Sequence, residues 1–110
     1  MKKEKSVFLQ IIGDSPKARI LDFLLMFPKF DYSLTEIARN SGVGYATLQL
    51  LWPDFVNKKI VVQTRIIGKA KLFKLNEDNP IIKDMLAWSW NLTKQQVLQE
   101  HNPVKIRVPA

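Results

Sequence analysis

The residues with the clearest chemical potential are six basic side chains close together in the middle of the chain. Between residues 55 and 76 there is no acidic residue, and the basic ones are Lys58, Lys59, Arg65, Lys69, Lys71 and Lys74. The whole chain has a formal charge of +7, so nearly all of the excess lies in this stretch. Clustered positive charge attracts polyanions, whereas scattered charge mainly keeps a protein in solution. A solvated lysine-rich face remains the alternative interpretation, because lysine is common on any surface.

No pattern typical of catalysis or of metal binding accompanies this basic stretch. The chain has no cysteine and one histidine, His101, which excludes thiolate nucleophiles, disulfides and histidine-rich metal sites. It has no glycine-rich phosphate loop either. The sequence therefore predicts a protein that is not an enzyme and that needs no metal or cofactor, and no polar cluster indicates a ligand pocket.

Length and composition point to one globular domain. A chain of 110 residues with 46% hydrophobic and 25% charged residues can bury one modest core. The apolar run behind the basic start is too short for a signal peptide, and no apolar stretch approaches the roughly 20 residues of a membrane-spanning helix. We therefore expect a soluble intracellular protein.

Local signals predict a mostly helical α+β chain. Helices are expected at 16–27, 33–41, 45–57 and from residue 80 onward, and strands at 60–67 and 72–75. Pro16 suits a first helical position, and Ser33 with Glu36 forms a capping box. Gly42 is a natural helix terminator. Two questions stay open: residues 6–12 can form a strand or a helical turn, and Pro53 either kinks the third helix or restarts it.

The order of these elements resembles that of the small winged helix-turn-helix transcriptional regulators, in particular the stand-alone archaeal kind. Two short helices joined by a glycine-containing turn precede a basic β-hairpin, the wing. The similarity covers about residues 13–87 and is carried by 13–21, 33–38, 47–55, 65–76 and 79–80. Lys59-Ile60-Val61 stands where the family usually has Gly-Leu-Val before the wing. The expected organisation is a segment 1–12, a winged helix-turn-helix domain 13–79, a terminal helix 80–100 and a flexible basic tail 101–110.

In such a fold the third helix is the expected reader of double-stranded DNA, because a helix fits the major groove. Residues placed to meet the bases are Tyr45, Ala46, Thr47, Gln49 and Leu50. Gln49 can pair with an adenine edge, and Ala46 or Leu50 can touch a thymine methyl. This helix has no lysine or arginine before Lys58, so it cannot make arginine-to-guanine contacts. Sequence recognition by this helix is therefore expected to favour A·T pairs or to depend mainly on DNA shape.

Affinity is expected to come mainly from contacts to the phosphate backbone. The basic wing can lie along the backbone or enter the minor groove and release counterions. The start of the second helix offers further phosphate contacts, although Ser33 is equally well explained as a simple cap. The residues assigned to backbone contacts are Ser33, Thr35, Lys58, Lys59, Arg65, Lys69 and Lys71.

The terminal helix has more apolar surface than a lone helix needs for docking on a small domain, which predicts a partner. Many relatives of this fold dimerise through terminal helices, so the resemblance implies a homodimer. The expected interface residues are Ile82, Met85, Leu86, Trp88 and Leu92. A DNA-binding homodimer of this kind is expected in the cytoplasm, associated with the nucleoid.

Two other functions fit the same residues. One is a protein-interaction or assembly adaptor, in which the apolar terminal helix is the main functional surface and the basic wing is incidental. The other is RNA binding through the wing. The uncharged third helix favours the adaptor, whereas the acid-free basic stretch favours DNA.

Overall fold

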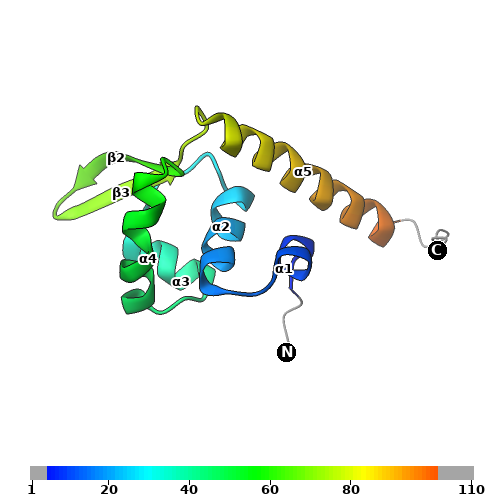
Figure 1. Ribbon diagram of the computed structural model, residues 1–110, viewed down its shortest axis with the longest axis horizontal. Helices are drawn as coiled ribbons and strands as arrows, with labels where there is room; N and C mark the ends of the chain where they lie inside the picture. The colour runs from blue at the N-terminus through cyan, green and yellow to red at the C-terminus, as the bar shows by residue number, and fades with distance from the viewer. Residues whose placement is uncertain (1–4, 102–110) are drawn as a thin grey trace.

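The computed structural model describes residues 5–101 (Figure 1). Within that range the elements follow in the order α1 (Val7–Ile12), α2 (Pro16–Met26), β1 (Tyr32–Ser33), α3 (Leu34–Ser41), α4 (Tyr45–Asn57), β2 (Val61–Ile67), β3 (Ala70–Leu75) and α5 (Pro80–His101). The expectation of a mostly helical α+β fold with a β-hairpin is confirmed. Most of the tail expected at 101–110 lies outside the described residues.

The helix boundaries follow from local capping chemistry. The Ser15 side chain accepts a hydrogen bond from the Ala18 amide at the start of α2, with proline at the first position. At the start of α3 the Ser33 hydroxyl accepts from the Glu36 amide and the Glu36 carboxylate accepts from the Ser33 amide. Gly42 ends α3 in the left-handed conformation, with φ of 72°. The predicted helix-turn-helix of α3 and α4 is therefore present.

The sheet is small, antiparallel and ordered β1-β3-β2. β2 and β3 form the predicted hairpin, whose turn is Gly68-Lys69. Gln63 pairs with Phe73 and Arg65 with Leu72, so the residue between them is a bulge. β1 was not predicted, because two residues show no alternation, and it forms only by pairing with β3.

Both questions left open by the sequence have answers in the structure. Residues 7–12 are helical rather than extended, and the Ser6 side chain caps them by accepting from the Leu9 amide. α4 runs as one helix from Tyr45 to Asn57 with Pro53 inside it, so the helix does not restart. Pro53 has no N–H to donate to the Gln49 carbonyl, which costs α4 one backbone hydrogen bond.

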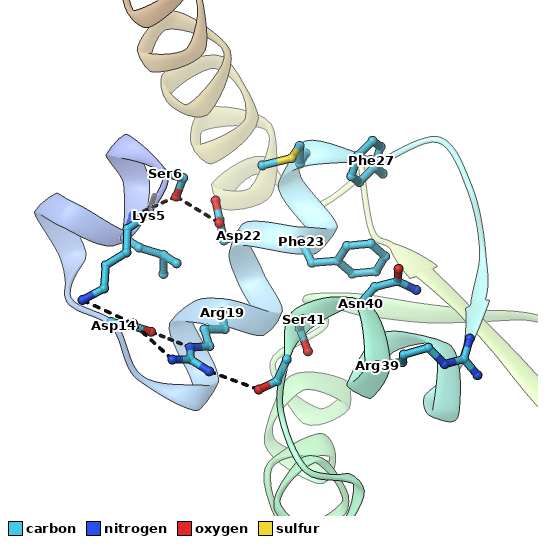
Figure 2. Close-up of a pocket in the computed structure, with 13 residues that line it drawn as sticks. Lys5, Ser6, Asp14, Arg19, Asp22, Phe23, Phe27, Arg39, Asn40 and Ser41 are labelled. Carbon is cyan, nitrogen blue, oxygen red and sulfur yellow. Dashed lines mark hydrogen bonds and ion pairs between the residues drawn. The ribbon is translucent and has the colours of Figure 1, made fainter. Parts of the chain in front are cut away.

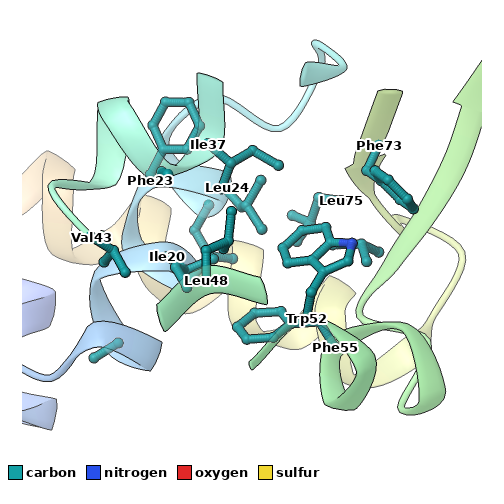
Figure 3. Close-up of a cluster of buried hydrophobic side chains, with 14 of the residues drawn as sticks. Ile20, Phe23, Leu24, Ile37, Val43, Leu48, Trp52, Phe55, Phe73 and Leu75 are labelled. Atoms are coloured by element: carbon teal, nitrogen blue, oxygen red, sulfur yellow. The ribbon is translucent and has the colours of Figure 1, made fainter. Parts of the chain in front are cut away.

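The core lies between α2, α3, α4 and the inner face of the hairpin (Figure 3). Its fully buried side chains are Ile20, Leu24, Ile37, Leu48, Phe55, Leu75 and Ile82. The Trp52 ring stacks on Phe55 with centroids 5.3 Å apart and meets Phe73 edge-on at the same distance. These contacts come from α4 and β3, so the helix that faces solvent on one side is held firmly on the other.

α5 leaves the end of β3 and passes α2 to reach α1 (Figure 1). Its start is fixed by Asn79, whose side-chain oxygen accepts from the Ile81 amide. Further along, the Trp88 ring lies edge-on to Phe8 of α1, with centroids 5.7 Å apart. The short α1 therefore packs against both α2 and the middle of α5.

Candidate nucleic-acid interface

All five side chains assigned to base reading are exposed on α4. Ala46, Thr47, Gln49 and Leu50 lie away from the buried face of the helix, which consists of Leu48, Trp52 and Phe55, whereas Tyr45 is exposed at the first position of the helix. Helical spacing explains the exposure of these four residues, because positions 48, 52 and 55 share the opposite side of the helix. The structure therefore places the expected reading residues on one accessible helix.

The turn that aims α4 is tied to α2 by an arginine that the sequence alone did not single out. Arg19 donates to the Gly42 carbonyl over 3.1 Å and pairs through its other nitrogens with Asp14 (Figure 2). The hydrogen bond from Arg19 lowers the pKa of Asp14 below its usual value. Because Gly42 separates α3 from α4, this contact holds the helix-turn-helix against α2.

α4 is held from a second side by an ion-pair cluster around Asp54. The Asp54 carboxylate accepts from Lys17 of α2 at 3.0 Å and lies 3.2 Å from the Lys58 ammonium. These hydrogen bonds, first that from Lys17, keep the pKa of Asp54 below its usual value. Lys58, assigned to the DNA backbone, therefore shares its charge with a carboxylate of its own helix.

Three lysines of the basic stretch stand free around the wing. Lys59, Lys69 and Lys71 are exposed, and none forms an ion pair with a carboxylate whose position the structure describes. Lys69 and Lys71 lie at the hairpin tip. Lys59 joins α4 to β2 with φ of 59°, the left-handed conformation that glycine adopts most easily. The family's usual glycine at this position is thus explained by backbone geometry.

Arg65 is engaged differently from the three free lysines. Its guanidinium donates twice to Asp31, at 2.9 and 3.1 Å, and the bulged residue Thr64 donates its hydroxyl to the same carboxylate. These bonds, chiefly those from Arg65, lower the pKa of Asp31 to about 2. Asp31 directly precedes β1, so the pair links the wing to the strand that leads into α3. Nothing in the sequence signals a contact across 34 residues.

The two residues assigned to the start of the second helix differ in availability. The Ser33 hydroxyl and amide are both used in the capping box, whereas Thr35 is exposed in the first turn of α3. Ser33 therefore serves as the helix cap, and Thr35 is the polar side chain of this turn that is more available for a phosphate contact.

Two cavities flank α2, although the sequence indicated no ligand pocket. The first, of about 810 Å³, lies between α1, α2 and the end of α3, and it is lined by charged groups that include Arg19, Arg39 and Asp22 (Figure 2). The second, of about 600 Å³, lies between α1, α2 and α5. Burial raises the pKa of Asp22, which accepts a hydrogen bond from Ser6. The position of α1 creates both cavities, and α1 was the element that the sequence left undefined.

The residues assigned to a dimer interface are largely occupied within the chain. Ile82 is 2% exposed, and Met85, Leu86 and Leu92 are partly buried against the core. Trp88 is 37% exposed beside Phe8. The apolar α5 side chains that remain open to solvent include Ile81, Trp90, Val97 and Leu98.

Neither a metal cluster nor a membrane span is found in the described part of the chain. No three histidine, cysteine, aspartate or glutamate side chains among its residues come together in a way that would hold a metal ion. Likewise, no helix within 5–101 combines the length and the apolar character that crossing a membrane requires.

The comparisons with known proteins bear on the fold. A scan against protein-family models and a search of curated proteins find no match. Among solved structures, the chain is similar to a MarR family transcriptional regulator from Silicibacter pomeroyi DSS-3, with a TM-score of 0.56 and 14% sequence identity. The match covers 86% of this chain and 68% of that one. At this identity the likeness shows the fold, and the chain is a winged helix-turn-helix protein.

Proposed function

We propose that this protein binds double-stranded DNA and regulates transcription, with α4 in the major groove and the wing on the backbone or in the minor groove. The observation that carries the proposal is the set of three free lysines, Lys59, Lys69 and Lys71, next to an accessible helix. Phosphate contacts of this kind supply affinity and register, while base edges supply specificity. The resemblance to stand-alone archaeal regulators and the likeness to a MarR family regulator support the same function.

Sequence reading in this proposal relies on neutral groups. Gln49 is exposed on α4 and carries the donor and acceptor that match an adenine edge. Thr35 and Tyr45 are exposed at helix starts and can hold phosphate oxygens. Because no cation lies on the exposed face of α4 before Lys58, the preferred sites are A·T-rich rather than guanine-rich.

A homodimer through α5 completes the proposal. The apolar groups offered to a partner are those that the chain's own core leaves uncovered, with Trp88 at the centre and Ile81 two turns before it. A two-fold protein matches a two-fold operator, which doubles the reading surface. A regulator of this kind acts in the cytoplasm, where the nucleoid lies.

DNA binding is tested by titrating a fluorescein-labelled duplex of mixed sequence and following anisotropy. Wild-type protein should bind with an affinity that falls steeply with salt, and Lys69→Glu/Lys71→Glu should abolish binding. The matched control is Lys83→Glu/Lys94→Glu, which makes the same charge change at exposed positions on α5. Equal losses in the two variants, or binding insensitive to salt, would contradict the proposal. Duplex RNA of the same sequence tests the RNA alternative.

A protein-interaction adaptor is the second candidate, and exposed apolar side chains on α5 favour it. Ile81 and Trp90 are each more than three-fifths exposed. Light scattering separates the cases: a dimer that becomes monomeric in Trp88→Ala/Ile81→Ala supports the homodimer. A wild-type monomer without DNA affinity supports the adaptor.

A further inference from the structure

The outermost line of α4 is apolar, which is unusual for a helix expected to meet DNA. Ala46, Leu50 and Pro53 follow one another at spacings of four and three residues, so they share the side of the helix opposite the core. Leu50 is 82% exposed, more than any other large hydrophobic side chain described. We call these three residues the apolar stripe.

Nothing within the described chain covers the stripe, and its support is rigid. Leu48 and Phe55, on the opposite side of α4, are completely buried. The one acidic group of α4, Asp54, is held by Lys17 and Lys58. The stripe is therefore a fixed neutral surface, flanked on one side by the amide of Gln49.

The chemistry of base edges decides what such a surface can recognise in the major groove. Thymine carries a methyl group there, and apolar side chains discriminate by contacting it. The hydrogen-bond donors and acceptors of the other base edges gain nothing from leucine or proline, which would leave them unpaired. From residue 46 to residue 53 the helix rises by about 10 Å. Base pairs repeat every 3.4 Å or so, which matches the stripe to about three successive pairs.

We propose that the apolar stripe recognises the methyl groups of thymines in a run of about three A·T pairs, with Leu50 as the central contact. This inference rests on the proposed DNA-binding function and names the class of sequence that it selects. Gln49, beside the stripe, is placed to read an adenine of the same run.

Replacing thymine by deoxyuridine tests the proposal, because it removes only the methyl group and keeps base pairing and charge. Two labelled duplexes are compared, one with a central run of A·T pairs and one with the same run as A·U pairs. Wild-type protein should lose about fourfold in affinity for each contacted methyl removed. If three methyls are contacted, the uracil duplex should bind about fiftyfold more weakly than the thymine duplex. Replacing cytosine by 5-methylcytosine in a G·C run should raise affinity.

The variant Leu50→Ala connects this effect to the stripe. Its preference for the thymine duplex over the uracil duplex should be about fourfold smaller than that of wild type, because Ala46 and Pro53 keep their contacts, and its affinity for the uracil duplex should be unchanged. Since Leu50 is exposed, the thermal stability of the variant should equal that of wild type, which circular dichroism checks. The matched control is Ile12→Ala, an exposed aliphatic truncation on α1, which should keep the wild-type preference for thymine.

The possible results separate this proposal from the one on which it rests. Equal affinity of wild type for both duplexes overturns methyl recognition and leaves DNA binding in place. A thymine preference as large in Leu50→Ala as in wild type also overturns it, and it leaves the stripe as a surface for a protein partner. No affinity for any duplex overturns both proposals.

Discussion

The salt dependence of DNA binding offers a quantitative test of the role of the wing. Each phosphate neutralised by a lysine contributes about 0.9 to the slope of log affinity against log salt. Lys69 and Lys71 are both exposed at the hairpin tip and form no ion pair with a described carboxylate, so each is expected to contribute the full value of about 0.9 to the slope. Lys69→Ala/Lys71→Ala should lower the slope by about 1.8 per protomer.

This change has a visible consequence over an ordinary salt range. Between about 50 and about 200 mM salt, a slope difference of roughly 1.8 means that the affinity of wild type falls by a factor about twelve times larger than that of the variant. Anisotropy titrations at four salt concentrations measure it. Lys83→Ala/Lys94→Ala on α5 serves as the control and should keep the wild-type slope.

Arg65 provides an internal comparison for the same experiment. Its charge is offset by Asp31, so Asp31→Asn/Arg65→Gln should change the slope far less than the loss of the two tip lysines. The reasoning is refuted if Lys69→Ala/Lys71→Ala lowers the slope by less than about 0.5, or if the control Lys83→Ala/Lys94→Ala lowers it by the same amount.

Three further predictions concern stability. The pKa of Asp31 is about 2 in the folded protein, below its unfolded value of 3.8, so the Asp31–Arg65 pair stabilises the fold above about pH 4 and this contribution is lost as the pH falls toward 2. The free energy of unfolding of Asp31→Asn should therefore fall less between about pH 4 and about pH 2 than that of wild type. An Asp31 that titrates near 3.8 by NMR would contradict this prediction. Phe55→Ala removes a fully buried ring stacked on Trp52 and should cost about 3–5 kcal/mol in urea unfolding; a loss below about 1 kcal/mol would show that this ring is not central to the core. Lys59→Gly removes the backbone strain of a non-glycine residue in the left-handed conformation and should raise the free energy of unfolding by about 0.5–1 kcal/mol. The same variant should lower the salt slope of DNA binding by about 0.9, because one lysine is lost. A destabilised variant would show that the Lys59 conformation is not strained.

Local signals were sufficient to predict the helix-turn-helix and the wing. The capping box at Ser33, the proline at the start of α2 and Gly42 at the end of α3 each act within a few residues, so the sequence states them directly. The exposed positions on α4 also followed from helical spacing alone.

Contacts between distant segments were not predictable in the same way. The pair of Asp31 with Arg65 and the contact of Arg19 with Gly42 depend on the finished fold. The strand β1 exists only because β3 lies beside it. Of the α5 residues expected at a dimer interface, Ile82 is buried in the chain's own core and Met85, Leu86 and Leu92 are partly buried against it, since an apolar stripe does not reveal which neighbour covers it.

Selection of bound sequences from a pool of random duplexes tests the central claim most directly. Wild-type protein should enrich A·T-rich sites, and with a two-fold dimer these sites should occur as inverted half-sites. The variant Lys69→Glu/Lys71→Glu should retain no more of the pool than beads alone. A wild-type protein that retains no duplex above this background, or that enriches guanine-rich sites, would contradict the account of a wing that binds the backbone and a neutral helix that reads A·T pairs.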